Sequence, residues 1–141
     1  MAQKVQFYGI KFPFTDESSE KYMFDLADNR VEQARSEVMH LLLTSKGERI
    51  RMPDFGTDLI RFIYDPSDSI QWNAVEREIR EAAKRWLTGI EIVKVEVLSG
   101  TKMNELNNVD EYTDTDVFVK VVFSVDLGYK KVTEELTRKI S

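Results

Sequence analysis

Apolar residues recur every three or four positions in two long stretches of this chain, which is the spacing of an amphipathic helix. The first stretch follows Asp28 and Asn29, both suitable N-cap residues, and predicts a helix over residues 30–43. The second predicts a longer helix that stops at Gly89, since glycine adopts the left-handed conformation at a helix end at little cost. The stripe of this longer helix consists of Trp72, Val75, Ile79, Ala82, Ala83 and Trp86. Between the two, an apolar run over residues 58–64 predicts one or two further helical turns.

Alternation of apolar and polar residues follows the second helix, and this period is that of a half-buried strand. Over residues 116–127, apolar residues at alternate positions share one face: Val117, Val119, Val121, Phe123, Val125 and Leu127. In residues 90–98 the parity changes between Ile92 and Val93, which predicts a β-bulge. The two stretches predict an antiparallel pair. Residues 99–115 between them are polar and acidic, and long for a hairpin loop, which predicts mobility or an insertion.

These elements predict an α+β fold (an α/β sandwich), in which two main helices pack on a small mixed or antiparallel sheet. A length of 141 residues indicates one domain over residues 1–141, large enough to bury a core without disulfides. No apolar run approaches the ~18 residues of a membrane span, and the N-terminus lacks the apolar core of a signal peptide. The net charge of −5 argues against general nucleic-acid binding, which needs a basic surface.

Residues typical of catalysis or metal binding form no recognisable pattern. His40 is the only histidine and there is no cysteine, so a zinc site is not expected. The six glycines are scattered and form no phosphate-binding loop. A glycosidase needs two carboxyl groups ~5–9.5 Å apart across a cleft, and no pair among the 25 Asp and Glu residues stands out. We therefore expect no catalytic residues, no metal and no cofactor.

The stretch over residues 41–62 is the most unusual part of the chain and reads LLLTSKGERIRMPDFGTDLIRF. An apolar helix ends in it, and a rigid turn without regular structure follows. The residues that set this turn are Gly47, Glu48, Arg49, Pro53, Phe55 and Gly56. Two interpretations of Arg49 stay open: it is solvated with the rest of the loop, or its planar guanidinium ties the turn to helix carbonyls or to a carboxylate. Either role is architectural.

The order of these residues, a helix ending LLLT, then G-E-R, three residues and P-x-F-G, resembles the signature of the GPW/gp25-like baseplate wedge family. That family occurs in contractile phage tails and in type VI secretion baseplates. Residues 9–14, which read GIKFPF, are similar to the family's opening segment, and the helices and strand to Leu98 come in the family's order. One departure follows the long helix. The family has an aromatic residue, Glu-Pro-Arg and Ile, whereas this chain has Trp86, Leu87-Thr88-Gly89 and Ile90.

The resemblance implies a structural protein and not an enzyme. It implies a baseplate wedge subunit of a contractile tail or injection machine, which links the wedge core to the first sheath ring and templates sheath assembly. The implied partners are other baseplate wedge proteins and the tail sheath, with neither nucleic acid nor membrane, and the isolated chain should be a monomer or weak oligomer. Its location would be the virion tail baseplate, or the bacterial cytoplasm as part of an injection machine. Two other classes stay open: a peptidoglycan-cleaving, lysozyme-like enzyme and a standalone adaptor domain.

Two segments are candidates for contacts with partners. Trp86, Leu87, Thr88 and Gly89 are candidates for contacting other wedge subunits, because they occupy the place of the family's Glu-Pro-Arg. Trp72 and Trp86 are most simply core residues, although Trp86 near the helix end could reach an interface.

The C-terminal arm, residues 129–141, is the candidate for contacting the sheath, through Val132, Leu136 and Ile140. These residues are spaced by four, so they share a face in a helix and also in a strand. Local propensity favours a helix, supported by pairs of opposite charge at helical spacing. The resemblance favours an extended strand that ends the sheet, and we adopt the strand as a hypothesis.

Overall fold

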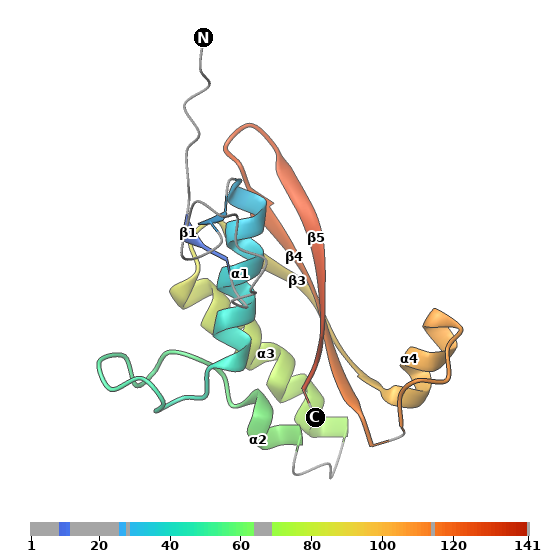
Figure 1. Ribbon diagram of the computed structural model, residues 1–141. Helices are drawn as coiled ribbons and strands as arrows, with labels where there is room; N and C mark the ends of the chain where they lie inside the picture. Colours follow the sequence, from blue (N-terminus) through green and yellow to red (C-terminus); the bar gives the residue numbers. More distant parts are fainter. Residues whose placement is uncertain (1–8, 12–25, 28, 64–68, 114, 141) are drawn as a thin grey trace.

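The computed structural model describes residues 9–11, 26–27, 29–63, 69–113 and 115–140, and it has the expected α+β architecture (Figure 1). The elements in chain order are β1 (Gly9–Ile10), β2 (Leu26–Ala27), α1 (Arg30–Leu43), α2 (Leu59–Ile63), α3 (Ser69–Trp86), β3 (Ile90–Ser99), α4 (Gly100–Asn107), β4 (Val117–Asp126) and β5 (Lys131–Lys139). The fold class is thus confirmed, and the sheet that carries the two main helices is antiparallel.

The main helices begin and end close to where the periodicity places them. Asn29 caps α1: its backbone is extended, and its Oδ1 accepts a hydrogen bond of 2.8 Å from the N–H of Glu32. The end of α3 is followed by Gly89, whose φ of 71° confirms a left-handed residue at this stop. The side chain of Trp72 lies outside the described part of the chain. Of the helices described, none combines the length and apolarity needed to cross a membrane.

The main sheet has three antiparallel strands in the order β3-β4-β5, so β3 and β5 are the edges among the described strands. The register of β3 against β4 shifts between Ile92 and Lys94, which confirms the predicted bulge. The C-terminal arm is confirmed as a strand, β5, paired with β4 along its whole length. A separate two-stranded sheet joins β1 to β2.

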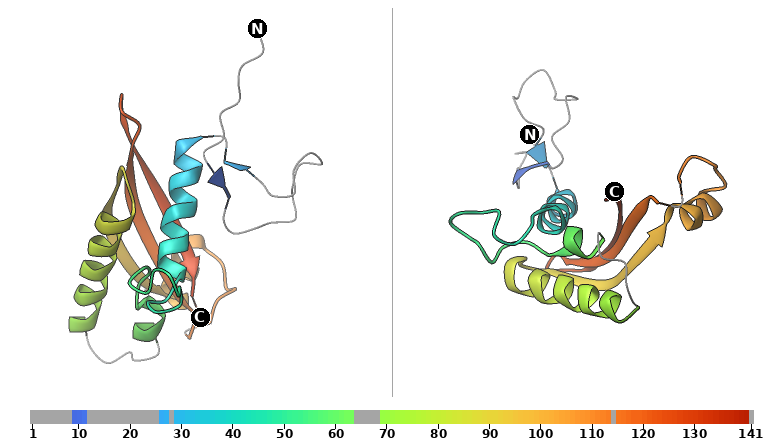
Figure 2. Two further views of the ribbon diagram at one scale, coloured as in Figure 1. Left: turned by 90° about the vertical axis from the view of Figure 1, so that its left-hand side faces the viewer. Right: turned by 90° about the horizontal axis from the view of Figure 1, so that it is seen from below.

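One face of the main sheet packs with α1 and α3 into a single core (Figure 2). Val117, at the start of β4, is half-buried, and the next four alternating residues on this face are at most 2% exposed. They are Val119, Val121, Phe123 and Val125. Helix α1 adds Val38 and Leu41 to the same cluster, and α3 adds Val75 and Ile79. Burial of each such side chain contributes about 1.5–3 kcal/mol, so the packing of both helices on one sheet face holds the fold together.

The connection between β3 and β4 differs from the long polar loop expected from its composition, because it contains helix α4 (Figure 1). The side chain of Asn104 donates to the carbonyl of Tyr112 at 2.7 Å and accepts from its N–H at 3.0 Å. The Tyr112 ring meets the ring of Phe118 edge on, with centroids 4.8 Å apart. These contacts fold the returning chain back onto α4 and β4. That this segment is an insertion compared with other family members stays a prediction.

Candidate interaction sites

The turn between α1 and α2 is closed at its base by backbone hydrogen bonds. The N–H of Thr57 donates to the carbonyl of Thr44 at 2.9 Å, and its hydroxyl donates to the carbonyl of Leu42 at 3.2 Å. Ser45 and Thr57 form an isolated parallel β-bridge. Gly56 has a φ of 113°, and a Cβ on it would collide with the carbonyl oxygen of Thr44. Only glycine therefore fits at Gly56.

Inside the turn, hydrogen bonds involve several of the residues that the sequence analysis named for it. The N–H of Gly47 donates to the carbonyl of Pro53 at 2.7 Å, which closes the wide part of the loop. The carboxylate of Glu48 accepts from the N–H of Ser45 at 2.9 Å, so Glu48 serves the local backbone and not Arg49. Two further bonds, from Met52 to Arg49 and from Phe55 to Met52, make consecutive tight turns. The loop thus has a defined shape from its own hydrogen bonds.

Phe55 ties the turn to both main helices. Its ring is 8% exposed and meets His40 of α1 and Trp86 of α3 edge on, at centroid distances of 6.0 and 5.6 Å. The guanidinium of Arg49 lies 3.9 Å from the centroid of the Phe55 ring. Arg85 lies over Trp86 at 4.9 Å. These five residues form a continuous stack, called here the aromatic stack, between the end of α1, the turn and the end of α3.

Arg49 reaches toward α1, but its partner there is neither a helix carbonyl nor a carboxylate. Its Nη2 lies 2.7 Å from Nε2 of His40. Burial lowers the pKa of His40, the charge of Arg49 lowers it further, and Glu48 opposes the change. A neutral imidazole accepts a hydrogen bond from a guanidinium, so the lowered pKa agrees with the geometry. His40 therefore has an architectural role in the turn.

A second anchor, which the sequence did not indicate, holds the base of the turn to α3. Lys46 forms an ion pair with Glu78 and lies 3.9 Å from a carboxylate oxygen of Asp58. Glu78 also accepts from the N–H of Asp58 at 3.2 Å. Because Glu78 lies on α3, this cluster and the aromatic stack fix the turn at two separate points.

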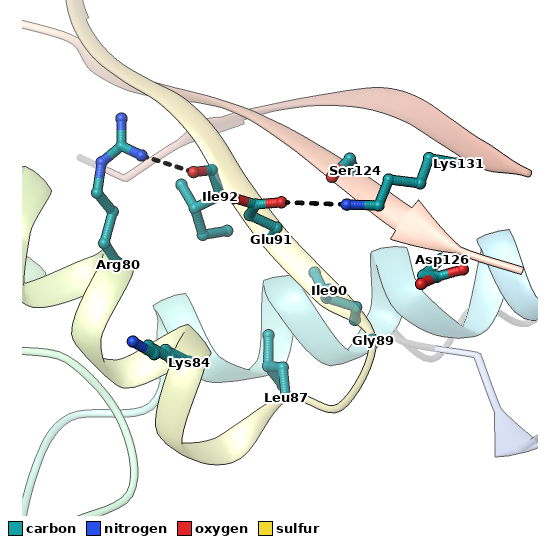
Figure 3. Close-up of a pocket in the computed structure, with 10 residues that line it drawn as sticks. All are labelled: Arg80, Lys84, Leu87, Gly89, Ile90, Glu91, Ile92, Ser124, Asp126 and Lys131. Carbon is teal, nitrogen blue, oxygen red and sulfur yellow. Dashed lines mark hydrogen bonds and ion pairs between the residues drawn. The ribbon is translucent and has the colours of Figure 1, made fainter. Parts of the chain in front are cut away.

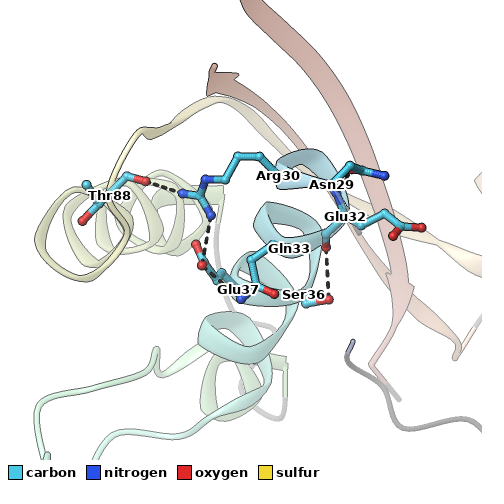
Figure 4. Close-up of polar contacts among 7 residues, drawn as sticks. All are labelled: Asn29, Arg30, Glu32, Gln33, Ser36, Glu37 and Thr88. Atoms are coloured by element: carbon cyan, nitrogen blue, oxygen red, sulfur yellow. Dashed lines mark hydrogen bonds and ion pairs between the residues drawn. The ribbon is translucent and has the colours of Figure 1, made fainter. Parts of the chain in front are cut away.

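The segment that replaces the family's Glu-Pro-Arg makes contacts within the chain. The carbonyl of Thr88 accepts from Nη2 of Arg30 at 2.6 Å, and Nη1 of Arg30 pairs with Glu37 at 3.1 Å (Figure 4). The carbonyl of Gly89 accepts from the N–H of Asp126 at 2.9 Å. Trp86 and Leu87 are half-buried and pack against the core, whereas Thr88 and Gly89 are exposed. Of the four candidates for wedge contact, only Thr88 and Gly89 are therefore largely open to a partner.

The three candidates for sheath contact face the core of this chain. Leu136 is 7% exposed and belongs to the core cluster, and Ile140 packs against it. Val132 pairs with Val125 on the same buried face of the sheet. The burial of these side chains fixes the position of the arm on the sheet. The part of β5 that remains open to a partner is its backbone edge, because an edge strand carries unpaired N–H and C=O groups. Among the described strands, β5 pairs with β4 alone.

A groove of about 510 Å³ lies between α3 and the start of β3 (Figure 3). Its two carboxylates are Glu91, which pairs with Lys131 at 3.6 Å, and Asp126, which accepts from the N–H of Gly128 at 2.8 Å. Both carboxylates thus already have partners within the chain. Within the described ranges, no group of three His, Asp or Glu residues could hold a metal ion.

Comparisons with known proteins agree with this architecture. The family described as "Baseplate wedge protein gp25" matches residues 29–113, more than half of the chain. No curated protein sequence matches this chain significantly. Among solved structures, the chain is similar to one described as a candidate tail lysozyme from Geobacter sulfurreducens. The TM-score is 0.57 at 17% sequence identity, over 80% of this chain and 93% of that chain. At that identity the likeness shows a common fold alone.

Proposed function

Because the chain belongs to the gp25 family of baseplate wedge proteins, we propose that it links the wedge core of a contractile tail to the first sheath ring and templates sheath assembly. Its surface would then serve two sets of partners, wedge proteins at one place and sheath at another. The role is structural, and the chain acts by presenting fixed surfaces.

The observation that carries this proposal is the edge strand β5. It ends a three-stranded antiparallel sheet, and its buried side chains hold it in register on β4. Such an edge can accept an additional strand from another chain by β-augmentation, in which backbone hydrogen bonds supply affinity. Lysine and arginine on and beside the strand discourage uncontrolled edge pairing. The residues concerned are Lys130, Lys131, Arg138 and Lys139.

The lysozyme-like alternative has less support in the groove of Figure 3. Its two carboxylates are engaged by a lysine and a backbone N–H, as described above. Outside the groove, the pKa values of two carboxyl groups, Glu96 and Asp116, depart from their ordinary values. Hydrogen bonds from Lys94 and Lys139 lower these pKa values, which is the reverse of what a general acid needs. We therefore expect no release of soluble fragments from purified peptidoglycan.

The first experiment removes the edge. A chain that ends after Leu127 lacks β5, and we expect it to join the baseplate but fail to nucleate sheath, as seen by electron microscopy of assembling tails. A truncated chain that joins the wedge and nucleates sheath normally would contradict the proposal. A wild-type chain missing from purified tail particles would contradict membership of the baseplate itself.

Because truncation also uncovers β4, a pair of milder variants is needed. Thr137 and Arg138 are adjacent and exposed in β5, and adjacent residues of a strand direct their N–H groups to opposite sides. Proline removes one donor at each position. Of Thr137→Pro and Arg138→Pro, the variant that breaks the β4 ladder should lower the melting temperature. The other should keep it and still impair sheath nucleation. Normal nucleation by the stable variant would exclude an added strand at this position.

A further inference from the structure

The side chain of Ile50 is 98% exposed at the tip of the turn between α1 and α2. This is the highest exposure among the large apolar side chains that the structure describes. Met52, two positions further, is also exposed. Figure 1 shows this loop standing away from the sheet and helices. A single exposed apolar residue is common on protein surfaces, so its setting has to decide whether it matters.

Ile50 stands on a loop whose backbone is closed by hydrogen bonds at two places. Its base is closed by bonds between Thr57 and Thr44, and its wide part by the bond between Gly47 and Pro53. The aromatic stack fixes the turn to α1 and α3 through Phe55. Because the backbone that carries Ile50 is already ordered, binding would not have to order that backbone.

The motif divides the loop into a frame and a tip. The frame consists of the residues that match the motif halves G-E-R and P-x-F-G, and these residues make contacts within the chain. Glu48 accepts from a backbone N–H, and the guanidinium of Arg49 lies over the ring of Phe55. The three residues between the two halves are Ile50, Arg51 and Met52, and their side chains are all exposed. The frame therefore serves the fold, and the tip is left to contacts outside the chain.

The charge of the tip is positive although the whole chain carries −5. The neighbouring acidic groups are occupied, since Glu48 binds a backbone N–H and Asp54 lies 3.5 Å from Arg85. In the described part of the chain, no carboxylate pairs with Arg51. Arg51 thus presents an unneutralised cation beside the exposed Ile50, a combination complementary to an apolar pocket with carboxylates on its rim.

We propose that this tip is an anchor for another baseplate protein of the same tail: Ile50 inserts into an apolar pocket on that protein, and Arg51 pairs with carboxylates at the pocket rim. The inference rests on the proposed function and adds a second contact surface, distinct from the edge of β5.

The test measures binding to a wedge complex purified from the other baseplate proteins of the same tail. Full-length wild type is compared with Ile50→Asp, Ile50→Leu and a matched control, Leu106→Asp. Leu106 is 67% exposed and lies on α4, far from the turn along the chain. We expect Ile50→Asp to weaken binding about tenfold or more. Ile50→Leu and Leu106→Asp should bind like wild type, and all four melting temperatures should agree.

Two further measurements identify the protein that binds the tip. Arg51→Glu should weaken binding at low salt, and the difference from wild type should shrink as salt is raised. A photo-crosslinker at position 50 should attach to one wedge protein, at a segment that combines apolar and acidic residues. Crosslinking to a second copy of this chain, or Ile50-dependent binding to anionic phospholipid vesicles, would overturn the proposed occupant.

Equal binding by wild type and Ile50→Asp would overturn the role of the tip while leaving the wedge assignment intact. Wild type that fails to bind the wedge complex at all would overturn both.

Discussion

The guanidinium of Arg49 lies 3.9 Å from the centroid of the Phe55 ring, and the two residues lie on either side of the tip of one loop. The same guanidinium reaches Nε2 of His40 at 2.7 Å, and the same ring meets Trp86. One cation and one ring therefore join the end of α1, the turn and the end of α3. The direction in which the loop tip points depends on this junction as well as on the backbone.

Replacement of Arg49 by alanine should destabilise the protein. The change removes a cation–π contact and a hydrogen bond to His40, together about 1–2 kcal/mol for a half-exposed group. Equilibrium denaturation in urea measures the change. Arg51→Ala is the matched control in the same loop, and it should shift stability by less than about 0.5 kcal/mol because its side chain is exposed. Equal effects of the two substitutions would mean that Arg49 is merely solvated.

Replacement of Gly56 by alanine should be much more costly than the same change at Gly128. Both glycines have positive φ, 113° and 85°, so both substitutions strain the backbone by about 1–2 kcal/mol. Only at Gly56 would the new Cβ strike a carbonyl, that of Thr44, whereas nothing lies within 4 Å at Gly128. We expect Gly56→Ala to cost about 3 kcal/mol or more, or to fail to fold. Thermal melts followed by circular dichroism should separate the two variants; overlapping melts would contradict the clash.

The His40–Arg49 contact should make stability depend on pH. Burial and the charge of Arg49 lower the pKa of His40 below its ordinary value of 6.5, so the unfolded chain takes up this proton at a higher pH than the folded chain does. The contribution of neutral His40 is therefore full above about pH 6.5 and declines as the pH falls toward the folded pKa.

The comparison that isolates this effect uses His40→Gln, whose amide oxygen can accept from Arg49 without titrating. Between about pH 7.5 and pH 5, wild type should lose more unfolding free energy than the variant. Parallel pH profiles for the two proteins would show that His40 does not carry the dependence.

Asn104 should control the order of the segment that contains α4. Its amide makes both hydrogen bonds to the backbone of Tyr112, so Asn104→Ala should cost about 1–3 kcal/mol locally. Hydrogen exchange measured by mass spectrometry should rise over residues 100–116 and stay unchanged in β5. Asn107→Ala is the control, because Asn107 is exposed at the end of the same helix. If both variants exchange alike, the amide clamp does not hold the segment.

The spacing of apolar residues, together with the residues that cap or stop a helix, was sufficient to predict the helices and strands of the core. The stripe of α3, the apolar residues at alternate positions of β4 and the change of parity at Ile92 each follow from which side chains must be buried. The burial of Phe118 on the other face of β4 is not part of that alternation and comes from the segment that contains α4. The cap at Asn29 and the stop at Gly89 are likewise local, since each depends on the backbone within a few residues.

Other features depend on residues that only the folded chain brings together. Helix α4 has a polar sequence with no clear apolar face. It is held by hydrogen bonds between Asn104 and Tyr112, a residue of the segment that leads back from α4 to β4. The partners of Arg49 could not be named because His40 comes within reach only through the direction in which α1 ends. The C-terminal arm has a spacing that suits a helix as well as a strand. Its pairing with β4 and the burial of Leu136 decided for the strand, because backbone and side chains are both satisfied only at that edge of the sheet.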